Sequence, residues 1–197
     1  GKKTGWFYEQ RESRRFVAEL AAGARVLDLQ SGAGAAGIAA ARAGADAGLA
    51  IDRSEPALTL AAASADLNGV GARCRFARGE AFAELARLAD AGEKFDVVIA
   101  DPPAFVKSRK DLGPGLRGYR KLARLAAARV AKGGLLFIAS CSHNVEPAAF
   151  AEAVRRGIED AERGGRILLS AGAAPDHPVH PALPETAYLK AQVLALD

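Results

Sequence analysis

The 197-residue sequence contains no methionine, and its only cysteines are Cys74 and Cys141. The missing methionine, initiator included, indicates that these residues are part of a longer chain. The two cysteines lie far apart and neither has the spacing of a metal-ligand motif, which argues against a disulfide framework or a zinc site. Each cysteine therefore has either a chemical role for its thiol or an ordinary role in packing.

The sequence also lacks long apolar runs. No stretch approaches the roughly 18 uninterrupted apolar residues of a membrane span, and the start Gly1-Lys2-Lys3-Thr4 lacks the apolar core of a secretory signal. Because 50% of the residues are apolar, the chain can bury one core but is too short for two comfortable ones. We therefore expect one domain over residues 1–197 of a soluble, cytoplasmic protein with no membrane partner.

Acidic residues are scarce between residues 107 and 132, where Asp111 is the only one. Such a basic segment suits a polyanion such as RNA, but a solvated helix face would have the same composition. Charge alone leaves both interpretations open. The basic residues are Lys107, Arg109, Lys110, Arg117, Arg120, Lys121, Arg124, Arg129 and Lys132.

Short β-rich runs alternate with helical patterns. The expected strands are 25–29, 49–52, 74–77, 95–100 and 135–139, and the expected helices are 12–22, 35–43, 55–68, 80–90, 115–130 and 147–162. Near-continuous apolar strands imply a sheet covered on both faces. Two closing strands, 167–169 and 188–196, have no helix between them and should pair antiparallel. The pattern predicts an α/β protein with a doubly wound, mostly parallel, seven-stranded sheet of Rossmann-like type.

The residues after the first two strands suit a nucleotide-like ligand, because ligands of open α/β sheets bind beyond the carboxyl ends of the strands. Gln30-Ser31-Gly32-Ala33-Gly34 forms a glycine loop before a helix, and Asp52 ends the second strand. Asp52 can accept hydrogen bonds from a ribose, and Asp28 can help to hold the amino-acid end of a methyltransferase cofactor. The pattern fits a dinucleotide fingerprint equally well, and glycines that only shape a turn are the structural alternative.

The fourth and fifth strands end in residues that can carry out chemistry. Asp101-Pro102-Pro103-Ala104-Phe105 forms a rigid, donor-poor turn that can hold a flat base against Phe105. Cys141 lies between two serines after the next strand, so Cys141 and Asp101 should flank the same crevice. A strand-ending turn and a buried core cysteine are the structural alternatives. The coincidence of the two features favours a nucleophilic Cys141.

A thiol beside a carboxyl group suits methylation of carbon 5 of cytosine. That carbon is too weak a nucleophile to take a methyl group until a thiolate has added to carbon 6. Asp101 could hydrogen-bond or protonate the ring near nitrogen 3, where negative charge develops. The target base must leave its stack or come from a single strand, because neither ring face is accessible in a duplex.

These residues resemble the bacterial large-subunit (23S) ribosomal RNA cytosine-5 methyltransferases, a branch of the class I S-adenosylmethionine-dependent superfamily. Ala104 stands where other RNA cytosine methyltransferases have a second cysteine, which implies a single-cysteine cycle. The family's N-terminal RNA-binding module has no counterpart in this sequence. The resemblance covers almost the whole chain and is carried by residues 4–14, 92–105, 117–120, 140–142, 176–179 and 188–190.

The resemblance implies a set of site residues, with S-adenosylmethionine as cofactor, large-subunit ribosomal RNA as partner, no metal, and a homodimer left open as an assembly state. Cys141 and Asp101 would be catalytic. The cofactor would contact Gln10, Arg11, Asp28, Ser31, Gly32, Gly34, Asp52, Arg53, Glu80 and Asp101. The RNA would contact Pro102, Pro103, Phe105, Arg117, Tyr119 and Arg120.

Six residues outside this set receive secondary interpretations. His177 is assigned a structural or substrate-loop role, and His143 could help to ionise Cys141. Cys74 starts an expected inner strand and is interpreted as core. Trp6, Phe7 and Tyr8 could stack on a base or pack over the cofactor.

Three other functions are weighed against cytosine-5 methylation. Methylation of a ring nitrogen or exocyclic amine would leave Cys141 incidental, and replacing Cys141 separates the two. A nicotinamide-dependent oxidoreductase built on the glycine loop would bind NAD rather than S-adenosylhomocysteine. A non-catalytic RNA-binding remnant would bind the cofactor without transferring a methyl group.

Overall fold

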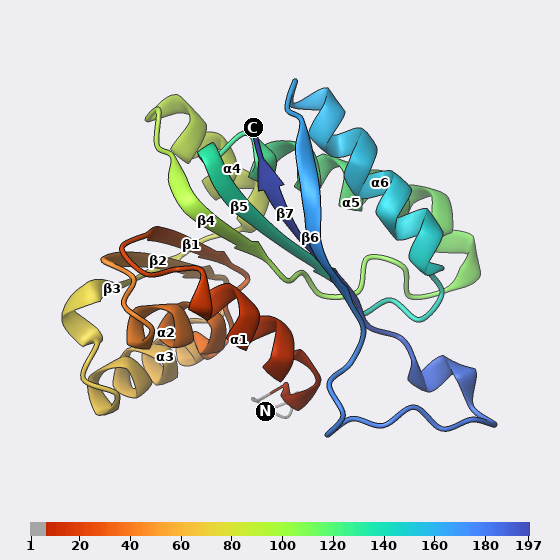
Figure 1. Cartoon of the computed structure of the whole chain (residues 1–197), viewed down its shortest axis with the longest axis horizontal. Helices are drawn as coiled ribbons and strands as arrows, with labels where there is room; N and C mark the ends of the chain where they lie inside the picture. Colours follow the sequence, from red (N-terminus) through yellow and green to blue (C-terminus); the bar gives the residue numbers. More distant parts are fainter. Residues whose placement is uncertain (1–6) are drawn as a thin grey trace.

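A computed structural model of the chain describes residues 7–197 (Figure 1). Strands and helices alternate as the sequence predicts, as far as the last helix. The elements are η1 (Tyr8–Gln10), α1 (Arg11–Glu19), β1 (Arg25–Leu29), α2 (Ala35–Arg42), β2 (Ala47–Asp52), α3 (Glu55–Leu67), η2 (Gly71–Arg73), β3 (Cys74–Arg78), α4 (Ala81–Asp90), β4 (Phe95–Ala100), η3 (Arg109–Asp111), α5 (Leu112–Ala127), β5 (Val130–Ser140), α6 (Pro147–Asp160), β6 (Gly165–Ala171), η4 (Pro184–Thr186) and β7 (Lys190–Leu196).

The seven strands form one sheet in the order β3-β2-β1-β4-β5-β7-β6. The first five pair in parallel, whereas β7 is antiparallel to both β5 and β6. Helices α1, α2 and α3 cover one face, and α4, α5 and α6 cover the other (Figure 1). This arrangement confirms the predicted doubly wound, mostly parallel sheet and its antiparallel ending.

Local signals fix several element boundaries. The Ser54 hydroxyl accepts a hydrogen bond from the Ala57 N–H at 3.4 Å, and Pro56 lies in the first turn of α3, as predicted. Helix α5 begins at Leu112, earlier than predicted, because Ser108 and Asp111 form a capping box around the preceding turn. The prediction that Cys74 starts an inner strand is wrong, because β3 is an edge strand of the sheet.

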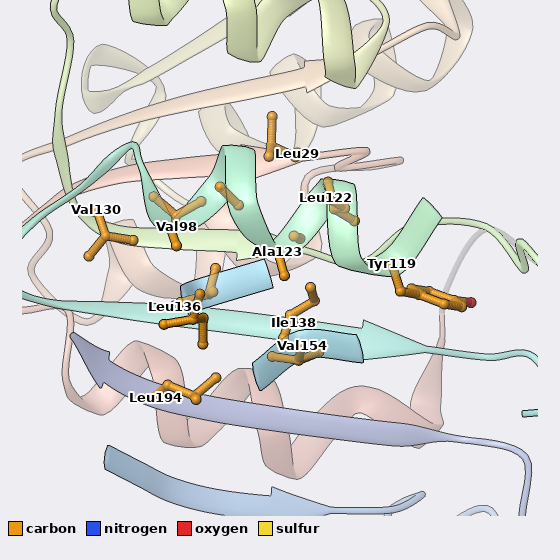
Figure 2. Close-up of a cluster of buried hydrophobic side chains, with 14 of the residues drawn as sticks. Leu29, Val98, Tyr119, Leu122, Ala123, Val130, Leu136, Ile138, Val154 and Leu194 are labelled. Carbon is orange, nitrogen blue, oxygen red and sulfur yellow. The ribbon is translucent and has the colours of Figure 1, made fainter. Parts of the chain in front are cut away.

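The larger core lies between the sheet and helices α4, α5 and α6 (Figure 2). Leu122 and Ala123 on α5 are fully buried, as are Leu136 and Ile138 on β5. Close packing of α5 and α6 depends on small residues, since a Cβ atom on Gly157 would lie 2.6 Å from the Cβ of Ala123. This packing holds α5 and α6 together on one face of the sheet. Within residues 7–197, no helix is long and apolar enough to cross a membrane.

Candidate active site

The carboxyl ends of β2, β1, β4 and β5 are neighbours in the sheet and carry the residues predicted to form a site. Asp28 lies in β1, Asp52 ends β2, Asp101 follows β4 and Cys141 follows β5. The parallel pairing therefore gathers three carboxyl groups and one thiol along one edge of the sheet. Such an acidic crevice favours a ligand that carries positive charge.

The loop between β1 and α2 is tied to the end of β2. The Gly32 N–H donates to Asp52 Oδ2 at 2.9 Å, and the Ser54 N–H donates to Asp52 Oδ1 at 2.8 Å. Gly32 and Gly34 have φ angles of 54° and 74°, in the left-handed region that glycine adopts without strain. The Asp52 carboxylate is thus held in place while each oxygen keeps a free lone pair for a ligand hydroxyl.

Asp28 lies behind this loop, almost completely buried. Burial raises the pKa of Asp28 to about 7, and the charges of Asp101 and Asp52 add to the rise. A hydrogen bond from the Gly37 N–H at 2.9 Å acts in the opposite direction. An ammonium group at this position would favour the ionised carboxylate.

Buried polar atoms without partners border the same crevice. Both amide atoms of Gln10, Oε1 of Gln30 and Oγ of Ser31 have no hydrogen-bond partner within the described residues 7–197. A buried polar group left unsatisfied costs about 1–3 kcal/mol, so these atoms fit a ligand that supplies donors and acceptors. Gln30 also has a left-handed φ of 57°, a strained conformation that is concentrated at functional sites.

Cys141 is held by hydrogen bonds of its two neighbours. The Ser140 hydroxyl donates to the Tyr119 hydroxyl at 2.8 Å, and the hydroxyls of Tyr119 and Ser142 lie 2.8 Å apart. The Val106 N–H donates to Ser142 Oγ at 3.2 Å, which ties in the turn after β4. All three hydroxyl-bearing residues are fully buried, so the backbone around Cys141 is fixed from both sides.

This arrangement brings Cys141 to the Asp-Pro-Pro turn, as the sequence predicts. Its Sγ lies 3.9 Å from the carbonyl oxygen of Pro102. Asp101 also lies near Arg14 of α1; burial lowers the pKa of Arg14, and the charges of Asp101 and Glu9 oppose that effect. The turn after β4, the tip of β5 and the first helix therefore meet at one place.

The predicted direct contact of Tyr119 with the substrate is wrong, because this residue is 0% exposed. Its ring packs between Phe105 and Phe150, with centroids 4.7 Å and 5.3 Å away. The amphipathic pattern of α5 places this tyrosine on the buried face. Tyr119 positions the cysteine instead.

Sequence reasoning missed a group of residues behind Cys141. Lys190, the first residue of β7, is buried, and its Nζ donates to the carbonyl oxygens of Ser142 at 2.6 Å and Tyr188 at 2.7 Å. The Tyr188 hydroxyl donates to Glu9 Oε1 at 3.1 Å, and burial with this bond raises the pKa of Tyr188 to about 12. The available signals were the segment 188–190, which carries part of the family resemblance, and a lysine that opens a mostly apolar strand.

Three other predicted cofactor residues either have partners within the protein or are exposed. The Glu80 carboxylate accepts hydrogen bonds from the N–H groups of Phe82 at 2.9 Å and Ala83 at 3.0 Å, so it caps α4. Arg11 is exposed and pairs with Asp176 at 3.3 Å. Arg53 is exposed as well.

The predicted RNA contacts do not all meet at Cys141. Phe105 lines an open groove of about 400 Å³ with Phe82, Lys107 and Gly118, and neither Asp101 nor Cys141 lines this groove. Pro102 is buried and Pro103 is exposed. The residues of the basic segment have different environments. Arg117 is exposed, whereas Arg120 pairs with Asp160 at 2.6 Å. Arg129 donates hydrogen bonds to the backbone carbonyls of Leu88 and Glu93.

Of the secondary interpretations, two concern loop histidines. The His177 ring packs edge-on against Tyr188 with centroids 5.4 Å apart. His143 is exposed. Cys74 is half-buried and packs against the small core cluster under α2 and α3. Trp6 lies outside the described residues.

The fold and the site together define a class of protein. A mostly parallel sheet, an antiparallel β7 between β5 and β6, a glycine loop and a fixed carboxylate at the end of β2 characterise the Rossmann-like methyltransferases. The chain belongs to the S-adenosylmethionine-dependent methyltransferase family, whose sequence profile matches residues 1–189. S-adenosylmethionine is therefore the cofactor, and the nicotinamide alternative loses its basis.

Similar proteins agree with this assignment. The chain is 38% identical over 195 residues to ribosomal RNA large subunit methyltransferase I of Aeromonas salmonicida, covering 98% of this chain and 49% of the relative. It is 38% identical over 198 residues to a ribosomal RNA large subunit methyltransferase of Deinococcus radiodurans, covering 100% of this chain and 48% of the relative. The chain thus spans about half the length of the curated relatives that it matches.

Solved structures show the same fold. A putative S-adenosylmethionine-dependent methyltransferase from Streptococcus mutans has a TM-score of 0.87 at 25% identity, covering 99% of this chain and 50% of that one. A putative methyltransferase in complex with S-adenosylhomocysteine has a TM-score of 0.86 at 24% identity, covering 97% of this chain and 50% of that one. The unpartnered atoms of Gln10, Gln30 and Ser31 and the fixed Asp52 carboxylate fit a cofactor that has ribose hydroxyls and an amino-acid end.

Replacing Tyr119 by phenylalanine tests the hydroxyl cluster. The substitution leaves the buried hydroxyls of Ser140 and Ser142 without their shared partner, so we expect the free energy of unfolding to fall by about 1–3 kcal/mol. Urea denaturation measures this free energy. The control is Tyr8→Phe, because Tyr8 is 61% exposed. Equal stabilities of the two variants would show that the cluster contributes nothing.

Asp28→Asn tests the buried carboxyl group. The native pKa of about 7 lies above the ordinary value, so the folded state keeps a proton that the unfolded state has lost. Wild-type stability therefore falls as the pH rises from about 4 through about 7, whereas asparagine stays neutral and can still accept from Gly37. We expect the variant to gain on the order of 2 kcal/mol over wild type between about pH 5 and 8. Denaturant titrations at constant ionic strength measure this difference, and parallel pH curves would contradict it.

Proposed function

We propose that this chain is the catalytic part of an enzyme that methylates carbon 5 of a cytosine in large-subunit ribosomal RNA, with Cys141 as the nucleophile. The observation that carries the proposal is the contact of Cys141 Sγ with the Pro102 carbonyl at 3.9 Å, directly after Asp101. We infer that a flat base held against this turn has both the Cys141 thiol and the Asp101 carboxyl group within reach. The names of the relatives from Aeromonas salmonicida and Deinococcus radiodurans support ribosomal RNA as the substrate.

The proposed reaction follows from the properties of the cytosine ring. The Cys141 thiolate adds to carbon 6, and Asp101 hydrogen-bonds or protonates the ring near nitrogen 3, so carbon 5 becomes electron-rich. S-adenosylmethionine supplies the electrophilic methyl group. A base then removes the proton from carbon 5, and the sulfur–carbon bond breaks to return the thiolate. Because Ser140 and Ser142 are fixed by Tyr119, the sulfur has a defined approach to the base.

The proposed site binds different groups of the cofactor with different residues. Asp52 binds the ribose hydroxyls, and Asp28 faces the amino-acid end, where a bound ammonium group lowers the energy of its ionised form. Ser31, Gly32 and Gly34 form the backbone of the loop beneath the cofactor. The remaining proposed cofactor contacts are Gln10, Arg11, Arg53, Glu80 and Asp101.

Exposed basic residues before and on the first half of α5 suit the RNA backbone. Lys107, Arg109, Lys110 and Arg117 are exposed beside the groove that Phe105 lines. Arg120 and Arg129 have protein partners instead. The proposed RNA surface is therefore narrower than the basic segment of the sequence, and Pro103 and Phe105 lie at its inner side.

Replacing Cys141 by alanine in the full-length protein tests the reaction. Without the thiol, carbon 6 receives no nucleophile, so we expect 5-methylcytidine formation to fall by more than about a thousandfold. The assay uses labelled S-adenosylmethionine and unmodified large-subunit RNA, followed by nucleoside analysis. Binding of S-adenosylhomocysteine should stay within about twofold of wild type.

The matched control is Cys74→Ala, because Cys74 is the other cysteine of the sequence and lies on the edge strand β3. It should leave product formation unchanged. If Cys141→Ala still produces a methylated nucleoside, thiol addition is wrong. A product methylated on a nitrogen would then favour the ring-nitrogen or amine alternative, and cofactor binding with no product from wild type would favour the RNA-binding remnant.

Charge reversal at Arg117 tests the proposed RNA surface. Arg117→Glu should weaken RNA binding and lower the slope of log affinity against log salt by about 1, because one phosphate contact and its released counterion are lost. Lys132→Glu, with the same charge change near the start of β5, is the control and should have little effect. If the salt dependence of RNA binding has the same slope in both variants, the basic face of α5 is an ordinary solvent-exposed helix face and does not bind RNA.

A further inference from the structure

Lys190 is a buried lysine immediately behind Cys141. It opens β7 and pairs in register with Ser140, the residue before the cysteine. Its Nζ donates to the carbonyl oxygen of Ser142, the residue after the cysteine, at 2.6 Å, and to that of Tyr188 at 2.7 Å. The ammonium group is therefore fixed by the same short segment that carries the thiol.

The electrostatic environment of Lys190 is unusual for a buried cation. Lys190 is 7% exposed. Among residues 7–197, no carboxylate oxygen lies within ion-pair distance of its Nζ. Burial lowers the pKa of Lys190, while the charges of Cys141 and Glu146 raise it, the former more strongly. A buried ammonium group without a carboxylate partner is unfavourable unless another anion lies near it. An ionised Cys141 sulfur would supply such an anion.

We propose that Lys190 is the counter-ion of Cys141, holding its sulfur in the ionised, nucleophilic state before the RNA binds. The inference rests on the proposed function, in which Cys141 attacks carbon 6. Lys190 is a positioning residue in this scheme. It forms no covalent bond, and the thiol proton leaves to solvent.

Three carboxylates lie near the residues behind the thiol. Glu146 acts on Lys190, Glu9 acts on Tyr188, and Asp101 acts on Arg14. Negative charges of this kind oppose ionisation of a nearby sulfur, which a counter-ion offsets. Arg14 of α1 lies near Asp101 and Glu9 and offsets part of their charge. Tyr188 adds no negative charge, because its pKa of about 12 keeps the phenol protonated.

The unmodified protein provides the first test. Its two cysteines are alkylated with iodoacetamide over a range of pH, without RNA or cofactor, and each site is quantified by peptide mass spectrometry. Cys141 should react with a midpoint below about pH 8.5, the value of an ordinary thiol. Burial raises the pKa of Cys74, so this cysteine is the internal contrast with a higher midpoint. A Cys141 midpoint at or above that of Cys74 would overturn the proposal.

Lys190→Gln and Lys190→Met provide the second test. Both remove the charge, and glutamine keeps donors for the two carbonyl groups. We expect Cys141 alkylation near neutral pH to fall about tenfold in both variants, because a midpoint one unit higher leaves about one tenth of the thiolate. The Cys74 rate and S-adenosylhomocysteine binding should not change, which shows that the fold is intact.

Lys94→Gln is the matched control. The Lys94 ammonium group also donates to a backbone carbonyl, that of Ala128 at 2.6 Å, and has no contact with the thiol. The control should leave the Cys141 profile unchanged. An unchanged profile in the two Lys190 variants would show that Lys190 only braces the backbone. Cysteine alkylation needs no methyl transfer, so this test is independent of the Cys141→Ala assay. Residual methylation by Cys141→Ala would refute the role of Cys141 as the nucleophile, but it would not refute the ion pair between Lys190 and Cys141.

Discussion

The position of Cys141 depends on the buried hydroxyl group of Tyr119. This hydroxyl joins α5 to the serines on both sides of the cysteine, and Ser142 extends the connection to the turn after β4. Three elements that are distant in sequence thus share one small polar cluster inside an apolar core. The cluster is fully satisfied, so it can specify geometry without a large loss of stability. The placement of thiol and carboxyl group depends on it.

The rest of the crevice is organised by negative charge. Three carboxyl groups lie at neighbouring strand ends, and burial raises the pKa of the most buried of them, Asp28, to about 7. A cofactor with a sulfonium and an ammonium group neutralises such a site. Behind Cys141 the polarity is reversed, because Lys190 is a cation in the protein interior. The sheet edge thus has an acidic half for the cofactor and a basic contact for the thiol.

Local features and the adjacency of consecutive strands could be predicted, whereas the insertion of β7 beside β5 and the edge position of β3 could not. The glycine loop and Asp52 were found because their spacing follows from one strand-helix-strand unit. Tyr119 was misassigned, since its motif appeared functional while its helical period buries it. Lys190 received no role, because only the pairing of β7 with β5 brings it to Cys141. The edge position of β3 likewise follows from the assembled sheet.

The insertion of β7 has a consequence for the order of assembly. Leu135 of β5 pairs with Ala195 of β7, and β6 reaches the sheet only through β7. While the chain is being synthesised, β5 therefore remains an unpaired apolar edge after β6 has already been made. Such an edge is open to pairing with other chains. A nascent chain that stops short of residue 190 has its cofactor loop but lacks Lys190, so the reactive thiol gains its cation only in the final stage of folding.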